Sequence, residues 1–116
     1  MKTNPIDKLV SQVAKLRADN KCEYCGEEYK KRETSHFHSR RKVSVRYDLD
    51  NVAWLCFHCH QEMHSHPNVH TEWFRKRLGS EKFEQLDVRS RMLAREMGLD
   101  KVKIKENLMG YLEALK

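Results

Sequence analysis

The chain has 116 residues, and its 23 Lys and Arg against 17 Asp and Glu give a formal net charge of +6. This length predicts a single domain over residues 1–116, with a modest core that a bound metal ion would help to stabilise. The basic excess favours an anionic partner such as nucleic acid. No apolar stretch is long enough to span a membrane, and the N-terminus lacks the apolar core of a signal peptide. We therefore expect a cytosolic protein with no membrane partner.

The N-terminal region, residues 1–20, predicts one amphipathic helix from residue 5 to about residue 18. Asn4 is a good capping residue, and Pro5 is favourable in a first helical turn. Apolar residues then recur at intervals of three and four, which predicts one buried face. They are Ile6, Leu9, Val10, Val13 and Leu16.

Two Cys-x-x-Cys pairs dominate the central region, residues 21–66. Cys22 and Cys25 form the first pair, and Cys56 and Cys59 form the second. Two such pairs are typical of a tetrahedral site for one structural zinc ion (Zn²⁺) with four thiolate ligands. Disulfides are the alternative, but in a reducing compartment paired cysteines at this spacing are better explained as metal ligands.

Between the cysteine pairs the chain predicts a short antiparallel hairpin. Residues 33–37 form the first expected strand, and the β-branched and aromatic run at 52–55 forms the second. The intervening residues 38–50 have little apolar periodicity and predict a basic loop. After Cys59 we expect a short helix that ends at His66, because Pro67 follows it.

The C-terminal third, residues 67–116, predicts three helices. The first covers 72–78, the second is capped by Ser80 and closes near Gly98, and the third carries apolar residues from Ile104 to Leu115. Their charges nearly balance, so we expect packing or oligomerisation, including a possible homodimer, rather than the main anion-binding face. The fold class is thus α+β, mostly helical.

The histidines point to chemistry beyond a zinc ribbon. All seven lie between His36 and His70, and the four-residue spacing of His60 and His64 places both on one helical surface. A zinc ion would hold both ends of the insert between the cysteine pairs, which brings His36 close to His60. We expect His66 and His70 to be surface residues.

At residues 22–66 this pattern resembles the HNH endonucleases, whose active site is a β-hairpin and a helix around one metal ion (ββα-metal). The signature residues occur in order as His36, Asn51 and His60, with the last directly after the fourth cysteine. The motifs His-x-x-x-Arg at 36–40, Arg-Tyr-Asp-x-x-Asn at 46–51 and Leu-Cys-x-x-Cys-His at 55–60 look closest to phage-borne members. Lambda-type recombination endonucleases are a weaker match.

The resemblance implies a metal-dependent DNA endonuclease that hydrolyses phosphodiester bonds. His36 would be the general base, and a divalent ion (Mg²⁺ or Mn²⁺) at His60 would stabilise the leaving 3′-oxygen. Asn51 would brace the loop under the base, and His64 corresponds to a further metal ligand in part of the family. A basic run such as residues 40–46 is often only a solvated loop. Beside a phosphate site, its three arginines would instead neutralise DNA phosphates without reading the sequence. They are Arg40, Arg41 and Arg46.

One position departs from the family pattern. The residue before the base is usually Asp or His and binds the metal, whereas this chain has Ser35. Serine is a weak ligand, so the ion would depend on His64, on waters or on His38.

Three other interpretations compete with the nuclease. The run from Cys56 to His60 also spells the c-type haem attachment motif, which would leave Cys22 and Cys25 unexplained. A non-catalytic zinc module that binds nucleic acid or protein explains the cysteines and the charge, but not the order of His36, Asn51 and His60. A zinc hydrolase acting on small molecules would need an open zinc position, which four thiolates close.

Overall fold

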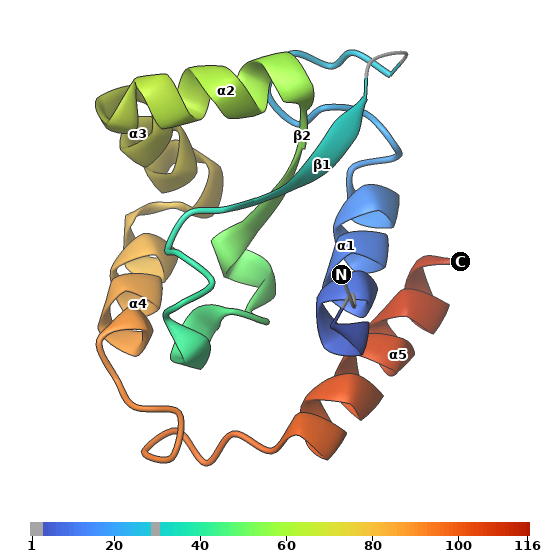
Figure 1. The fold of residues 1–116 in the computed structure, drawn as a ribbon, viewed down its shortest axis with the longest axis vertical. Helices are drawn as coiled ribbons and strands as arrows, with labels where there is room; N and C mark the ends of the chain where they lie inside the picture. The colour runs from blue at the N-terminus through green and yellow to red at the C-terminus, as the bar shows by residue number, and fades with distance from the viewer. Residues whose placement is uncertain (1–3, 29–30) are drawn as a thin grey trace.

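The computed structural model describes residues 4–28 and 31–116, so positions 1–3 of the predicted N-terminal region and 29–30 of the predicted core lie outside it. The described chain combines helices with one two-stranded sheet (Figure 1), which confirms the mostly helical α+β class. The elements are α1 (Pro5–Arg17), β1 (Arg32–His36), the 3₁₀ turns η1 (Val43–Val45) and η2 (Leu49–Asn51), β2 (Val52–Cys56), α2 (Phe57–Ser65), α3 (Pro67–Leu78), α4 (Ser80–Ser90) and α5 (Lys101–Leu115). Among these helices, none has the length and apolarity needed to cross a bilayer.

The hairpin divides the interior into two clusters. β1 and β2 pair antiparallel, with Ser35 opposite Ala53 and His36 opposite Val52. Alternate residues of a strand face opposite sides of the sheet, and directly paired residues share a side. One side packs on the cysteines and on Phe74 of α3, and the other packs on α1 and α5. Ser35 therefore faces the cysteine side, and His36 faces the α1 side.

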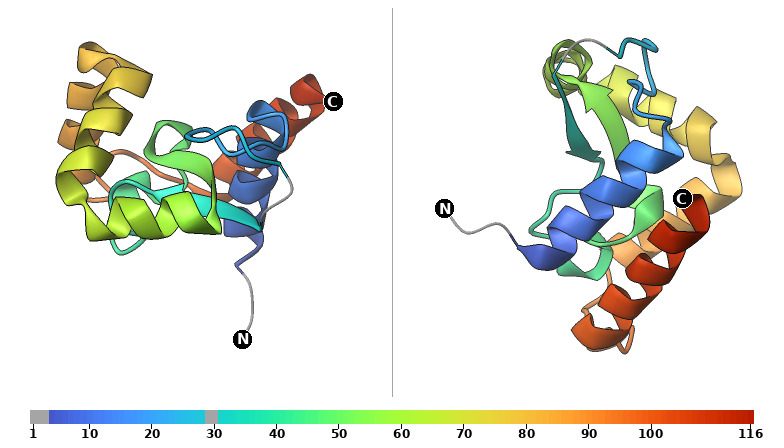
Figure 2. Two further views of the ribbon diagram at one scale, coloured as in Figure 1. Left: turned by 90° about the horizontal axis from the view of Figure 1, so that it is seen from above. Right: turned by 90° about the vertical axis from the view of Figure 1, so that its right-hand side faces the viewer.

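The helices surround this hairpin. In Figure 1, α1 and α5 lie together on one side, α3 and α4 lie on the other, and α2 runs across the end of the strands. Figure 2 shows α1 and α5 side by side in a second view. The long segment from residue 91 to 100 connects α4 to α5. Both C-terminal helices thus pack within the chain, because α4 contacts α3, η1 and η2, and α5 contacts α1.

The predicted N-terminal helix is confirmed, including its cap. Asn4 Oδ1 accepts hydrogen bonds from the backbone N–H groups of Ile6 (2.8 Å) and Asp7 (3.3 Å). The helix ends where the backbone enters the left-handed region at Asp19 and Asn20 (φ +54° and +57°). These residues turn the chain toward Cys22.

Two predicted helix boundaries in the C-terminal third are wrong. α3 begins at Pro67 and not at residue 72, because the same proline that ends α2 is favourable at the first position of a new helix. α4 has Gly79 at its N-cap, with Ser80 as its first residue, so no side chain caps it.

The end of α4 also differs from the prediction, since the helix stops at Ser90 rather than near Gly98. The Ser90 hydroxyl donates to the Asp87 carbonyl, and Arg91 N–H bonds the Val88 carbonyl three residues back. The last turn is therefore tightened to 3₁₀ geometry. Leu93, the last residue of the apolar pattern that predicts a longer helix, is 52 % exposed, so no packing extends the helix.

Candidate functional site

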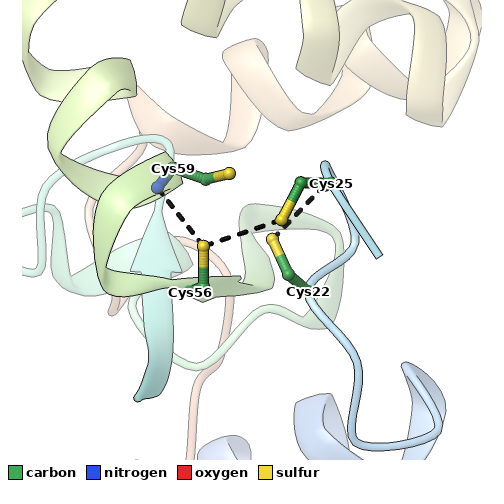
Figure 3. A group of neighbouring side chains, drawn as sticks. All are labelled: Cys22, Cys25, Cys56 and Cys59. Carbon is green, nitrogen blue, oxygen red and sulfur yellow. Dashed lines mark hydrogen bonds between the residues drawn. The ribbon is translucent and has the colours of Figure 1, made fainter. Parts of the chain in front are cut away.

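The four cysteines converge at the base of the hairpin. Cys22 and Cys25 lie on the loop after α1, Cys56 ends β2, and Cys59 lies in the first turn of α2 (Figure 3). None of them forms a disulfide, and their sulfur atoms all lie within 4.8 Å of one another. They form a potential metal-binding site, as the spacing of the two pairs predicts.

The geometry of this cysteine cluster fits a zinc ion. A tetrahedron with Zn–S bonds of about 2.3 Å has S–S edges of about 3.8 Å, and the Cys25 and Cys56 sulfur atoms are 3.7 Å apart. The backbone N–H of Cys25 donates to the Cys22 sulfur (3.5 Å), and that of Cys59 donates to the Cys56 sulfur (3.4 Å). Burial would raise the pKa of Cys22, but nearby backbone N–H groups outweigh it and lower this pKa to about 7. Burial instead raises the pKa of Cys25 and of Cys59, so the thiolate, the form that binds metal, is favoured at Cys22 but not at these two.

A cleft of about 640 Å³ opens beside β1, between α1, the basic loop and α2. Its lining is rich in polar and charged side chains. They include Asp7 and Ser11 of α1, Glu33, Thr34 and His36 of β1, Arg40 of the loop, His60 and His64 of α2, and His70 of α3. The structure therefore brings His36 of β1 and the two α2 histidines, His60 and His64, to one cavity.

His36 is held in a defined tautomer. Its Nε2 lies 3.1 Å from the backbone carbonyl oxygen of Arg46. A carbonyl oxygen only accepts, so Nε2 carries the hydrogen and Nδ1 keeps its lone pair. Burial, the largest influence, and the Arg40 charge lower the pKa of His36 below its ordinary 6.5, although the hydrogen bond to Arg46 opposes them. The ring is thus neutral at pH 7 and can accept a proton.

His60 is oriented by a carboxylate. Its Nδ1 lies 2.5 Å from Glu33 Oε1, so Nδ1 carries the hydrogen and Nε2 is free to bind a metal. The second histidine on this face, His64, places its Nε2 3.1 Å from that of His60. A carboxylate that holds the distal nitrogen of a histidine is the usual outer-shell support of a metal ligand.

These two nitrogens fit adjacent positions of one octahedral ion. With metal–nitrogen bonds of about 2.1 Å, two such nitrogens lie about 3.0 Å apart, close to the 3.1 Å between His60 and His64. In the part of the chain that the structure describes, only the cysteines form a close group of three or more His, Cys, Asp or Glu ligands. An ion at His60 and His64 would thus keep positions for water and phosphate.

Ser35 and His38, the other ligands considered from the sequence, do not line this cleft. Ser35 is 1 % exposed, and its hydroxyl has no hydrogen-bond partner among the described residues. The ring of His38 faces α4, with Nε2 3.9 Å from the Asp87 carboxylate. The structure instead supplies Glu33 as the partner of His60. Sequence reasoning placed Glu33 at the start of the first strand and missed this role, because the pair forms over 27 residues and no local pattern indicates it.

Asn51 is fully buried and ties the basic loop to the start of β2. Its Nδ2 donates to the carbonyl oxygens of His38 (3.0 Å) and Val45 (3.1 Å), and its Oδ1 accepts from the His38 N–H (2.8 Å). These three bonds fix both ends of the segment that carries Arg40 and Arg41. They also hold Val45, whose neighbour Arg46 supplies the carbonyl bound to His36.

The three arginines of the loop differ in their surroundings. Arg40 and Arg41 are exposed, and Arg40 lies on the rim of the cleft. Arg46, also expected beside a phosphate, is only 28 % exposed, and its guanidinium is ion-paired with Asp7 of α1. The two exposed side chains are thus the ones available to an anion from solvent.

His70 corrects another expectation. It is not a surface residue: it lines the cleft, and its Nε2 is buried without a hydrogen-bond partner among the described residues. Burial, together with the neighbouring His64 and His60, lowers the pKa of His70 to about 4. His66, in contrast, is exposed as expected.

Residues 22–66 match the family model of the HNH endonucleases. The match includes both cysteine pairs and the histidines at 36, 60 and 64, and it confirms the family resemblance seen in the sequence. Over these residues the chain is therefore similar to the HNH endonucleases. No curated protein and no solved structure matches the chain.

Proposed function

We propose that this protein is a metal-dependent DNA endonuclease whose active site is the cleft beside β1. The observation that carries the proposal is the convergence in one cleft of a neutral histidine with a free Nδ1 (His36) and two histidine nitrogens 3.1 Å apart (His60 and His64). Phosphodiester hydrolysis requires these two parts, a base for the attacking water and a centre of positive charge at the leaving oxygen.

In this mechanism His36 acts as the general base. A water molecule held at Nδ1 loses its proton to the imidazole as it attacks phosphorus, while the Arg46 carbonyl accepts from Nε2 and stabilises the imidazolium that forms. Asn51 keeps this loop in place through its bonds to His38 and Val45. The products expected from this chemistry are 5′-phosphate and 3′-hydroxyl ends.

Two metal ions have separate tasks. Zn²⁺ at the four cysteines would be structural, because four thiolates leave it no open position. Mg²⁺ or Mn²⁺ bound by His60 and His64 would stabilise the negative charge on the leaving 3′-oxygen. Glu33 holds the His60 ring so that Nε2 faces His64.

The outer-shell role of Glu33 gives a test of the catalytic ion. Outer-shell partners contribute about 10–100-fold to metal affinity, so Glu33→Gln should raise the Mn²⁺ concentration for half-maximal plasmid nicking by about that factor. Nicking at saturating Mn²⁺ should stay near wild type. The control is Glu62→Gln on α2, the helix that carries His60, because Glu62 is exposed and paired with His66. An unchanged Mn²⁺ requirement in Glu33→Gln would remove this carboxylate from the metal site.

Arg40 and Arg41 are proposed contacts to DNA phosphates. Each lost contact flattens the log–log dependence of binding on salt by about 0.9, so the double alanine variant should reduce the slope by about 1.8. Arg91→Ala with Arg95→Ala is the control, because both side chains are exposed outside the cleft. A wild-type slope in Arg40→Ala/Arg41→Ala would mean that these residues only solvate the loop.

We place this activity in the cytosol of a bacterium or a phage-infected cell, as part of a phage-type nuclease. The four free cysteines support this location, because a reducing compartment keeps such pairs available for metal.

A further inference from the structure

We infer that an ion pair between Asp7 and Arg46 is a positioning device for the general base, so that helix α1 belongs to the active site. This inference rests on the proposed function. Asp7 lies in α1, before the segment that matches the HNH model, and it lines the same cleft as His36. Arg46 lies on the loop between η1 and η2. The sequence alone indicates only a phosphate contact for this arginine.

Arg46 makes one contact through its backbone and another through its side chain. Its backbone carbonyl oxygen is the group that His36 Nε2 binds, at 3.1 Å. Its guanidinium forms a two-pronged pair with Asp7, with Nε 3.1 Å from Oδ1 and Nη2 2.5 Å from Oδ2. Forked arginine–carboxylate pairs fix geometry as well as charge. The side-chain pair therefore restrains the carbonyl that sets the tautomer of His36.

The surroundings make this restraint effective. The side chains of Asp7 and Arg46 are only 15 % and 28 % exposed, which limits screening by solvent. A second contact joins the start of α1 to the same loop, because Asn4 Nδ2 donates to the Tyr47 hydroxyl (3.0 Å). Asn51 holds the preceding carbonyl, that of Val45. The backbone around the Arg46 carbonyl is thus restrained from η2 on one side and from α1 on the other.

The Asp7–Arg46 ion pair also neutralises a negative charge at the cleft. An unpaired Asp7 carboxylate beside His36 would repel a DNA phosphate, and the Arg46 guanidinium neutralises it. An arginine that is occupied in this way is not free to contact DNA. The positioning role and the phosphate-contact role therefore predict different results when Asp7 is changed.

A double-mutant cycle in plasmid nicking distinguishes the two roles. Because a positioned base contributes about 10²–10⁴-fold, we expect Asp7→Asn and Arg46→Met each to lower kcat by about tenfold or more. Asp7→Asn should not weaken DNA binding, whereas Arg46→Met should weaken it because it leaves the Asp7 carboxylate unpaired in the cleft. The double variant should be no slower than either single one, since all three lose the same pair. Asp7→Glu keeps the carboxylate and should retain most of the activity.

The matched control is Arg89→Met. Arg89 of α4 forms a comparably buried ion pair with Asp48 (2.8 Å). Asp48 lies on the same loop as Arg46, but neither residue of this pair supplies the carbonyl oxygen that binds His36. The Arg89→Met variant should lose stability to a similar extent and keep its kcat. Equal loss of kcat in Arg89→Met, or additive losses in the Asp7 and Arg46 variants, would overturn the inference. So would a weaker DNA affinity and flatter salt slope in Arg46→Met with normal kcat in Asp7→Asn.

A spectroscopic readout separates this inference from the proposed function. In ¹⁵N-edited NMR of the imidazoles, His36 of the wild type should be the Nε2–H tautomer, and this preference should weaken in both Asp7→Asn and Arg46→Met. A wild-type tautomer preference in both variants would overturn the inference even if the protein nicks DNA. Conversely, a wild type without nicking activity would contradict the proposed function, whatever the tautomer shows.

Discussion

Replacing His36 by alanine should abolish DNA nicking while leaving the fold, the zinc content and DNA binding close to wild type. The imidazole lines the cleft and carries its hydrogen on Nε2, so the substitution removes the Nδ1 lone pair that accepts the water proton. General-base catalysis contributes about 10²–10⁴-fold, and we expect a loss in that range with a faint residual rate. Single-turnover nicking at saturating Mn²⁺ measures it.

His38→Ala is the matched control for this prediction. His38 lies two residues away, but its ring faces Asp87 of α4 and does not line the cleft. We therefore expect near-wild-type nicking from His38→Ala. The pH dependence provides a second check: the pKa of His36 is lowered mainly by burial, so nicking should fall only as the pH drops below the ordinary histidine range. Equal losses in the two variants would mean that His36 is not the base.

The second large effect is expected at the cysteine cluster. Structural zinc contributes about 10–16 kcal/mol to folding in small zinc domains, which is comparable to the entire stability of about 5–15 kcal/mol of a typical domain. Replacing one thiolate by serine should therefore unfold the region around the hairpin and release the ion. Elemental analysis and thermal unfolding of each variant measure this effect.

Exposure provides a control within the cluster. Cys25 is exposed, whereas Cys59 is buried, yet both sulfur atoms belong to the same group of four. If the site binds zinc, Cys25→Ser should be about as damaging as Cys59→Ser. Phe57→Ser, at an exposed position in the same region, should be tolerated. A folded Cys25→Ser variant with unchanged melting temperature, or folded wild type with far less than one zinc per chain, would contradict a structural zinc site.

The local features of the fold could be predicted from the sequence because they are encoded by short patterns. The Asn4-Pro5 start of α1, the apolar run of β2 and the two cysteine pairs each depend on neighbouring residues. The end of α4 could not, because its apolar pattern continues to Leu93 and only the missing tertiary partner shows that the helix stops earlier.

The candidate site was predictable where its residues occur in the motif and not where they meet by long-range packing. His36, Asn51 and His60 carry the family signature, and all three lie in the matched segment. Glu33 and Asp7 occur in charged or amphipathic stretches that resemble any solvated surface. Their roles follow from pairs formed over 27 and 39 residues, between Glu33 and His60 and between Asp7 and Arg46.

The most direct test of the central claim is one supercoiled-plasmid assay with wild type and His36→Ala prepared identically. Each protein is incubated with Mn²⁺ or with a chelator, and the nicked product is then treated with DNA ligase. We predict nicking by the wild type in Mn²⁺ alone, and resealing by ligase, which requires 5′-phosphate and 3′-hydroxyl ends. Equal nicking by the two proteins, or no nicking by the wild type in Mn²⁺, would contradict the account and favour a non-catalytic zinc module.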